Sequence, residues 1–259
     1  MDYETRTLTQ KVSKAKVLRL FLDYDGTLTE FAPSPNIVSP NKEVISLLKR
    51  LVKNKEILPA VISGRRLGHI QKLLPVPGLL MGGTYGVEIQ LPNGELCSRL
   101  SLPQFRPALE NLLPYWQAII ADKEGMVLED KGYSLALHGR LASQAEAEKT
   151  LAEASEIVKT INPGNNFQLW KGNLFLEIAP VEASKYKAVQ WILNEFTPEG
   201  ALVVYIGDDD KDEEAFEVVQ SAGGIAVRVT STPLRTSAQY LLKDPLQVRD
   251  WLRELLVAK

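Results

Sequence analysis

The chain has 259 residues, of which 45% are hydrophobic, and a formal net charge of −2 at pH 7. This length is enough for one large or two modest domains with a full hydrophobic core. The near balance of charge gives no electrostatic basis for binding nucleic acid or an anionic membrane surface, and no apolar stretch reaches the length of a membrane span. Cys97 is the only cysteine, so an internal disulfide is excluded and a cytoplasmic location is expected.

The first hundred residues predict alternating strands and helices. Pro33 and Pro35 indicate a loop after the first strand, and Ser39 followed by Pro40 resembles a helix N-cap with proline in the first turn. This βαβαβ rhythm is typical of a doubly wound parallel sheet. The expected helices are Leu8–Lys16, Asn41–Asn54 and Arg66–Leu74, and the expected strands are Leu18–Leu22, Ile57–Ile62, Gly78–Met81 and Val87–Leu91.

The pattern changes after Leu100 and predicts an inserted α+β domain. We expect the core to comprise residues 1–100 and 183–259 and the insert to comprise residues 101–182. In the insert we expect a helix over Pro107–Lys123 that is interrupted near Pro114, strands over Met126–Asp130 and Tyr133–Arg140, a helix over Ser143–Thr160, and a hairpin of Phe167–Trp170 and Leu174–Ile178. The core then resumes with a helix over Ser184–Phe196, a strand over Leu202–Ile206, an acidic turn over Gly207–Asp212, a helix from Glu213 and a strand over Gly224–Val229.

Two carboxylates, Asp23 and Asp25, follow the first buried strand with one residue between them. In open α/β sheets, ligands bind beyond the carboxyl ends of the strands. Like charges so close are costly unless a cation or a shared proton balances them, and a hard metal ion such as Mg2+ does so. The strand at Leu202–Ile206 also ends in acids, so Asp208 is expected to join Asp23 around one cation. The alternatives are an aspartate that caps a turn and a helix N-terminus enriched in acids.

Two further places predict contacts with an anion. Ser63, Gly64 and Arg65 follow the second strand, where a hydroxyl and backbone N–H groups can bind an anion. A plain helix N-cap at Ser63 is the alternative. Lys185 opens the helix that returns from the insert, where a cation is disfavoured, so its position indicates a compensating anion. Lys187 is the competing candidate, and a solvated surface lysine is the alternative for both.

These four pieces, in this order, resemble the haloacid dehalogenase superfamily of phosphohydrolases. Its pattern is a strand ending in DxDGT, a strand ending in Ser or Thr, a helix-borne Lys and a strand ending in GDxxxD, matched here by Asp23–Thr27, Ser63, Lys185 and Gly207–Asp212. The resemblance implies an α/β fold with a doubly wound parallel-sheet core and an inserted α+β cap domain. It also implies that Asp23 is the nucleophile that forms an aspartyl-phosphate, while Asp25 is the acid and base.

The same resemblance implies a Mg2+ cofactor and a set of residues around it. The metal ligands would be Asp23, the carbonyl oxygen of Asp25, and Asp208. Ser63 and Lys185 would bind the phosphoryl oxygens. From outside the ligand set, Asp209 and Asp212 would orient Lys185 or bound water.

The strand Tyr133–Arg140 of the insert alternates between apolar and polar side chains, which predicts an antiparallel sheet with one wet face. The run ExKxxSxxxHxR at residues 129–140 and the later ExxP at Glu177 and Pro180 resemble the cap of trehalose-6-phosphate phosphatases. The SGR at residues 63–65 and the GDDxxDExxF at residues 207–216 match that family as well. The resemblance implies a substrate-binding set of Gly64, Arg65, Glu129, Lys131, His138, Arg140 and Glu177.

We therefore expect a Mg2+-dependent phosphatase that acts on trehalose 6-phosphate. The expected partners are a small-molecule sugar phosphate and a trehalose-6-phosphate synthase, and the chain is expected to be a monomer. The alternatives are a phosphatase for another glycosyl phosphate, such as glucosyl- or mannosyl-3-phosphoglycerate, a sugar phosphomutase, and a non-catalytic phosphosugar sensor. The chain departs from the family pattern at Thr84 and Tyr85, which replace the usual Glu-His, and at Lys211, which replaces the usual Thr.

Overall fold

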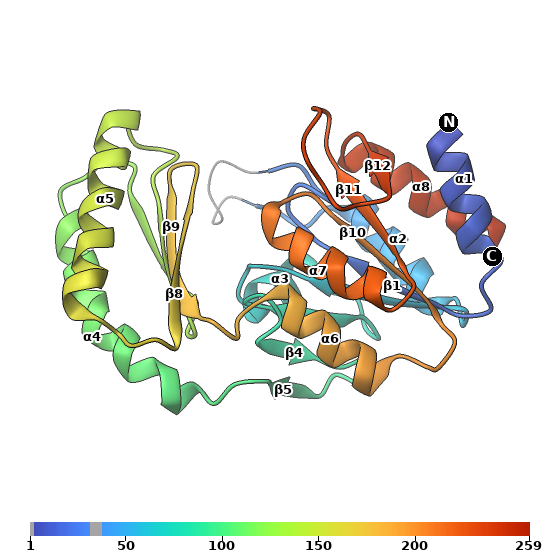
Figure 1. Ribbon diagram of the computed structural model, residues 1–259, viewed down its shortest axis with the longest axis horizontal. Helices are drawn as coiled ribbons and strands as arrows, with labels where there is room; N and C mark the ends of the chain where they lie inside the picture. Colours follow the sequence, from blue (N-terminus) through green and yellow to red (C-terminus); the bar gives the residue numbers. More distant parts are fainter. Residues whose placement is uncertain (1–2, 32–37) are drawn as a thin grey trace. The chain divides into compact units, whose positions relative to one another are not determined.

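The computed structural model describes residues 3–31 and 38–259 (Figure 1). The described chain divides into two compact units. The first contains the residues up to Phe31 together with Ser39–Cys97 and Ser184–Lys259, and the second contains Ser98–Ala183. The loop predicted at Pro33 and Pro35 lies outside the described residues.

The first unit is built on an eight-stranded sheet with the order β12-β11-β10-β1-β2-β3-β4-β5. The six strands from β12 to β3 are parallel, and β4 is antiparallel to β3. This arrangement confirms the predicted α/β class. The strands are β1 Leu18–Leu22, β2 Ile57–Ile62, β3 Leu80–Gly83, β4 Glu88–Gln90, β5 Leu96–Ser98, β10 Leu202–Gly207, β11 Ile225–Val229 and β12 Tyr240–Leu242.

Strand β1 lies in the middle of this sheet, between β10 and β2, and all five of its residues are buried. It pairs in parallel with β10 on one side and with β2 on the other, so that Leu22 is level with both Ile206 and Val61. The three strands therefore end at the same edge of the sheet. The one charged residue of β1, Arg19, donates hydrogen bonds to Leu58 O and Thr197 Oγ1.

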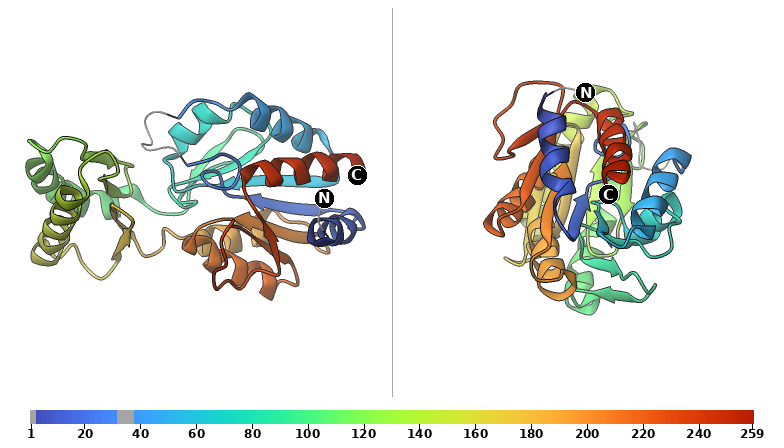
Figure 2. Two further views of the ribbon diagram at one scale, coloured as in Figure 1. Left: turned by 90° about the horizontal axis from the view of Figure 1, so that it is seen from above. Right: turned by 90° about the vertical axis from the view of Figure 1, so that its right-hand side faces the viewer.

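Helices cover both faces of the sheet. Figure 2 shows α6 and α7 on one face and α2 and α3 on the other. The face under α6 and α7 carries a core cluster that includes Phe21, Ile62, Ile192 and Phe216. The helices are α1 Tyr3–Ser13, α2 Lys42–Lys53, α3 Leu67–Leu73, α6 Lys185–Phe196, α7 Asp210–Ser221 and α8 Pro245–Ala258.

Four predicted helix starts are wrong. The first helix begins at Tyr3 instead of Leu8, and the helix predicted over Pro107–Lys123 begins at Leu102. Helix α2 is capped by Asn41, whose side chain accepts from the backbone N–H groups of Glu43 and Val44, and not by Ser39. Helix α7 begins at Asp210 instead of Glu213, because Asp209 and Asp212 form a capping box. The acids that were expected in a turn therefore belong to the first turn of a helix.

The second unit is a four-stranded antiparallel sheet with the order β6-β7-β9-β8, packed against two helices. Helix α4 runs without a break through Pro107 and Pro114, so the predicted interruption is wrong. Its buried face, with Leu109, Leu112 and Trp116, packs in the core of this unit and keeps the helix continuous. The elements are α4 Leu102–Ile120, β6 Val127–Asp130, β7 Leu135–His138, α5 Gln144–Ile161, β8 Phe167–Gly172 and β9 Phe175–Pro180.

Within the described ranges, none of the helices combines the length and the apolar character that a membrane crossing requires.

Candidate active site

The site of the first unit lies where β1, β2 and β10 end. Asp23 follows β1, and its backbone N–H donates to Ile206 O of β10 at 3.0 Å. Asp208 follows β10, and Ser63 follows β2. The parallel register thus brings three of the predicted site positions to one edge of the sheet.

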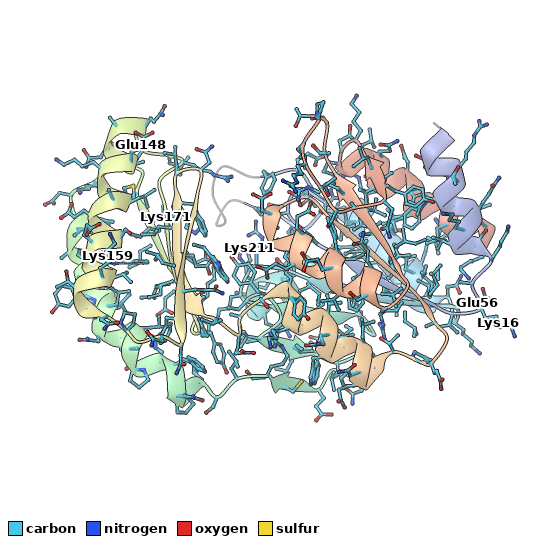
Figure 3. The ribbon with its side chains drawn as sticks, in the orientation of Figure 1. Lys16, Glu56, Glu148, Lys159, Lys171 and Lys211 are labelled. Carbon is cyan, nitrogen blue, oxygen red and sulfur yellow. The ribbon has the colours of Figure 1, made fainter. Side chains whose placement is uncertain are left out.

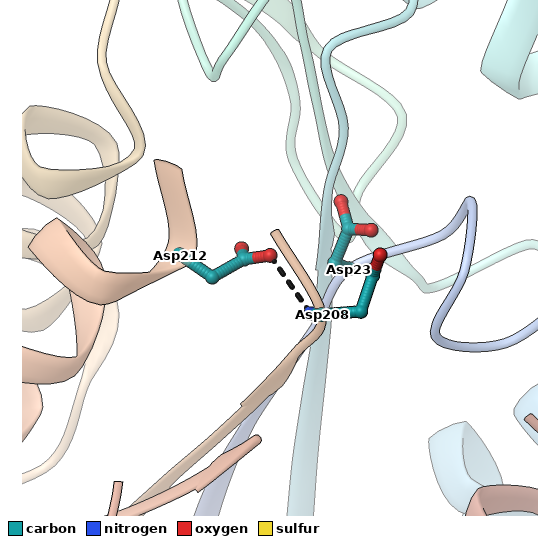
Figure 4. Close-up of side chains that lie close together, drawn as sticks. All are labelled: Asp23, Asp208 and Asp212. Carbon is teal, nitrogen blue, oxygen red and sulfur yellow. Dashed lines mark hydrogen bonds between the residues drawn. The ribbon is translucent and has the colours of Figure 1, made fainter. Parts of the chain in front are cut away.

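Asp23, Asp208 and Asp212 form a cluster in which one carboxylate oxygen from each lies within 4.8 Å of the others (Figure 4). Gly26 permits this approach, because a Cβ atom there would lie 2.2 Å from Asp208 Oδ2. Thr27, which sequence reasoning did not assign, donates from Oγ1 to Asp208 Oδ1 at 2.8 Å. Within the DxDGT motif, Asp23 therefore supplies a carboxylate of the cluster, Gly26 leaves space for Asp208, and Thr27 donates a hydrogen bond to it.

Asp212 is fully buried and accepts hydrogen bonds on both of its oxygens. Its Oδ1 accepts from Lys185 Nζ at 2.6 Å and from the Tyr205 hydroxyl at 2.6 Å. Its Oδ2 accepts from the backbone N–H groups of Asp208 and Asp209, each at 3.0 Å. With both oxygens engaged in this way, Asp212 is suited to hold its neighbours in place.

Lys185 opens α6 as expected and is 2% exposed. Its ammonium donates to Asp23 Oδ1 at 2.8 Å and lies 3.7 Å from Asp209. Burial acts to lower the pKa of Lys185, but the charges of Asp209, Asp212 and Asp23 outweigh it and raise that pKa well above its usual value. A permanent positive charge therefore sits beside Asp23.

One lysine does not balance the carboxylates around it. Burial, together with the charges of Asp212 and Asp208, raises the pKa of Asp23 well above its usual value despite Lys185. Burial and the charges of Asp212 and Asp209 raise the pKa of Asp208 to about 7. A compact set of carboxylate oxygens with excess negative charge fits a hard divalent cation.

The Ser63–Arg65 segment differs from a plain helix cap. Ser63 is buried, and its Oγ accepts from Arg65 N at 3.1 Å. Helix α3 begins only at Leu67, with Arg66 in the N-cap position, so Ser63 does not cap it. Arg65 forms a two-pronged pair with Asp25, with both N–O distances at 2.6 Å.

The loop that follows β3 contacts the Ser63–Arg65 segment. Thr84 and Tyr85 both have positive φ angles, 48° and 57°, which is uncommon for non-glycine residues. The backbone N–H of Tyr85 donates to Ser63 O at 2.9 Å, and that of Thr84 donates to Arg65 O at 2.7 Å. Lys211 Nζ donates to the Tyr85 hydroxyl at 2.5 Å. The two departures from the family pattern therefore meet in space.

The polar face of the second unit contains one ion pair and one hydrogen bond between a carboxylate and an imidazole. Glu177 is fully buried and accepts from Lys131 Nζ at 2.9 Å and from Ser134 Oγ at 2.7 Å. The hydrogen bond joins Glu129 and His138, at 2.9 Å. Burial acts to raise the pKa of Glu129, but the hydrogen bond from His138 and the charges of Lys131 and His138 together outweigh it and leave that pKa below its usual value. Part of the face that was expected to be wet is thus buried.

Strand register explains how these residues meet. Glu129 on β6 and Glu177 on β9 both pair with Ala136 of β7, so the small alanine lies between two carboxylates on one face. Trp170 of β8 is level with Glu177 on the same face, and sequence reasoning missed it. The predicted Arg140 is exposed and lies beyond the end of β7.

Comparison with known proteins then identifies the family. The family model described as Trehalose-phosphatase matches residues 21–245. The chain belongs to the trehalose-phosphatase family. Probable trehalose-phosphate phosphatase 3 of Oryza sativa subsp. japonica is 28% identical over 266 residues, which cover 95% of this chain and 71% of that protein.

Solved structures support the same fold for this trehalose-phosphatase family member. The C-terminal domain of C. albicans trehalose-6-phosphate phosphatase superposes with a TM-score of 0.86 at 19% identity and covers 98% of this chain and 96% of that chain. A haloacid dehalogenase-like hydrolase from Bacteroides thetaiotaomicron gives 0.62 at 15% identity, with 93% of this chain and 99% of that chain covered. The predicted haloacid dehalogenase fold is confirmed, and family membership places the chain among the phosphoric monoester hydrolases.

Proposed function

We propose that this chain hydrolyses trehalose 6-phosphate to trehalose and inorganic phosphate. The observation that carries the proposal is the family match over residues 21–245, joined to the placement of Asp23, Asp208 and Lys185 at one sheet edge. A phosphate monoester needs a nucleophile, a proton donor and positive charge close together, and this edge supplies all three.

Asp23 is the proposed nucleophile. Its carboxylate forms a bond to phosphorus while the bond from phosphorus to the sugar oxygen breaks, giving an aspartyl-phosphate. Asp25 donates a proton to the leaving oxygen and then takes one from the water that hydrolyses the intermediate. Both oxygens of Asp25 accept from Arg65, which holds this carboxylate at the edge where Asp23 lies, so the pair must open before Asp25 can carry and donate a proton. Ser63 and Lys185 bind the phosphoryl oxygens.

The residues present fit a Mg2+ ion. We assign its ligands to Asp23, the carbonyl oxygen of Asp25 and Asp208, since Asp212 already accepts hydrogen bonds on both oxygens. When bound, this ion supplies positive charge that offsets the negative charge of the phosphoryl group. Asp212 and the helix N-cap Asp209 hold Lys185 and the Asp208 backbone in position.

The insert of residues 101–182, which lies within the second unit, is the proposed cap domain that binds the sugar. Carboxylates, a lysine and an imidazole on one sheet face suit the hydroxyl groups of a disaccharide. Glu129, His138, Lys131 and Glu177 provide them, with Trp170 level with Glu177. Arg140, Gly64 and Arg65 stay in the proposed substrate-binding set. The single cysteine supports a cytoplasmic location.

A panel of phosphate esters tests this function. Purified protein with Mg2+ is incubated with trehalose 6-phosphate, glucosyl-3-phosphoglycerate, mannosyl-3-phosphoglycerate, glucose 6-phosphate and p-nitrophenyl phosphate, and released phosphate is measured. The proposal expects kcat/KM for trehalose 6-phosphate to exceed that for each of the others by about tenfold or more. A higher value for a glycosyl phosphoglycerate would replace the proposed substrate, and no release from any ester would favour a non-catalytic sensor.

A further inference from the structure

Tyr205 is a tyrosine of the hydrophobic core whose hydroxyl contacts the carboxylate cluster. It lies on β10, level with Phe21 of β1, and is fully buried. Its hydroxyl lies 2.6 Å from Asp212 Oδ1, the oxygen that also accepts from Lys185. Figure 3 labels Lys211 in the first turn of α7, the turn that also carries Asp212. The contact therefore joins the core of the first unit to the start of α7.

Aromatic neighbours fix the ring of Tyr205. The Phe21 ring stacks on it, with the ring centroids 6.0 Å apart, and the Phe216 ring meets it edge-on at 5.7 Å. Burial and the charge of Asp212 raise the pKa of Tyr205 well above its usual value, so the phenol keeps its proton. The hydroxyl therefore donates a hydrogen bond to Asp212 from a fixed position.

The hydrogen bonds of Asp212 show what this donor adds. A carboxylate has about four acceptor sites, and two backbone N–H groups donate to Oδ2 of Asp212. Its Oδ1 accepts from Lys185 and from Tyr205, each at 2.6 Å. Lys185 Nζ also donates to Asp23 Oδ1 at 2.8 Å, so the two carboxylates compete for one ammonium. A second donor on Oδ1 weakens the attraction of Asp212 for that ammonium and favours its contact with Asp23.

We propose that Tyr205 is a positioning residue for phosphoryl transfer, because its hydrogen bond to Asp212 keeps the Lys185 ammonium directed at Asp23. The ammonium then lies beside the oxygens on which negative charge develops as the bond from Asp23 to phosphorus forms. Tyr205 acts only through Asp212 and Lys185. The inference rests on the proposed phosphatase function and adds to it a residue of the hydrophobic core.

This role has a consequence that a purely structural hydroxyl lacks. In Tyr205→Phe, Asp212 Oδ1 has one donor fewer and attracts Lys185 more strongly. Lys185 should then lose its contact with Asp23, which lowers the rate of the chemical step and leaves substrate binding nearly unchanged. A hydroxyl that only stabilised the fold would change the Tm and leave turnover per folded molecule unchanged.

The test compares Tyr205→Phe with Tyr133→Phe, which removes another buried hydroxyl, one that donates to Leu100 O at 2.9 Å in the second unit. Turnover of p-nitrophenyl phosphate at saturating Mg2+ is measured together with the Tm. Tyr205→Phe is expected to lower kcat by about three- to tenfold, as for the loss of one hydrogen bond, with KM within about twofold. Tyr133→Phe is expected to leave kcat on this ester unchanged.

A double-mutant cycle with Asp212→Asn tests whether Tyr205 acts through Asp212. Without the charge of Asp212 the two carboxylates no longer compete, so Tyr205→Phe should change kcat by less than about twofold in that background. The full loss in both backgrounds would overturn the proposal, as would an unchanged kcat in Tyr205→Phe alone.

A crystal structure of Tyr205→Phe provides a measurement that needs no turnover and no second substitution. The distance from Lys185 Nζ to Asp23 Oδ1, which is 2.8 Å in the parent protein, should lengthen beyond hydrogen-bond range, about 3.5 Å. An unchanged distance would contradict the proposal. The longer distance in a protein that hydrolyses p-nitrophenyl phosphate but not trehalose 6-phosphate would leave this inference standing and reject the proposed substrate.

Discussion

Two buried polar clusters, one in each unit, balance their charges in different ways. At the sheet edge of the first unit, Asp23, Asp208 and Asp212 share Lys185 as their buried cation. In the second unit, Glu177 is paired with Lys131, and Glu129 with His138. The first cluster thus needs charge from a ligand, whereas each carboxylate of the second has a hydrogen-bonding partner within the chain.

This difference predicts that the carboxylates of the first cluster are needed for catalysis, whereas Glu177 of the second cluster also contributes to the stability of the fold. Neutralising an acid in the unbalanced cluster removes repulsion, so the fold should tolerate it while turnover is lost. Neutralising Glu177 in the second cluster leaves the buried charge of Lys131 alone, which is costly. The predictions below test that contrast, from the largest effect to the smallest.

Asp23→Asn should produce the largest loss. An amide cannot form the aspartyl-phosphate, so kcat on trehalose 6-phosphate should fall by roughly 10,000-fold or more. Thermal unfolding should show a Tm that is equal to or above that of the parent protein, because one carboxylate of the crowded cluster is gone. Wild-type turnover in this variant would show that another residue is the nucleophile.

Asp25→Asn should keep the nucleophile but lose proton transfer. A general acid–base residue contributes roughly 100- to 10,000-fold, and kcat should fall within that range. The loss should be smaller for p-nitrophenyl phosphate, whose leaving group needs little protonation. Equal losses on the two substrates would count against the acid role of Asp25.

Glu177→Gln should affect both stability and specificity. Breaking the buried pair with Lys131 should lower the free energy of unfolding by about 3 kcal/mol in urea denaturation. Among folded molecules, kcat/KM for trehalose 6-phosphate should fall by about tenfold or more, while the rate on p-nitrophenyl phosphate stays within a few-fold.

The control for this variant is Glu156→Gln in the same unit. Its ion pair with Lys159 is exposed, with side chains 68% and 65% accessible, so the loss of stability should be about 0.5 kcal/mol or less. A similar cost for Glu177→Gln and Glu156→Gln would mean that the buried pair is not balanced as described. Equal losses on the disaccharide and on the generic ester would mean that Glu177 has only a structural role.

Asp208→Asn should remove a Mg2+ ligand and so lower turnover, but its effect on the stability of the metal-free protein should be small and should depend on pH. In the metal-free protein the pKa of Asp208 is raised from 3.8 to about 7. A raised carboxyl pKa adds stability that is fully present below the unfolded value and is lost as the pH rises through 7. At pH 8 the metal-free variant should therefore be more stable than the parent by about 1 kcal/mol, or roughly 2–4 °C in Tm. At pH 4 the two should be similar, and a constant difference across this range would contradict the charge imbalance.

Much of the core could be predicted because its signals are local. The buried strands Leu18–Leu22 and Ile57–Ile62 were predicted with their observed bounds. Strand ends that carry acids place Asp23 and Asp208 together once the sheet is parallel. Helix α8 was missed, although Asp244 as N-cap and Pro245 in the first turn were local signals for it.

Other features depend on contacts between distant segments. The pair between Asp25 and Arg65 joins residues 40 positions apart, and the contact between Tyr85 and Lys211 joins residues 126 positions apart. The periodicity of the sequence does not reveal such contacts. The position of Trp170 directly opposite Glu177 depends on the register between β8 and β9. The continuity of α4 through Pro114 depends on tertiary packing, which overrides the local preference against proline.

Metal dependence tests the central claim most directly. Protein treated with EDTA and dialysed is assayed for phosphate release from trehalose 6-phosphate before and after addition of Mg2+. If the cluster of Asp23 and Asp208 needs a cation from outside the chain, release should be abolished in metal-free buffer and restored by Mg2+. Full turnover in metal-free buffer would contradict that account of the site.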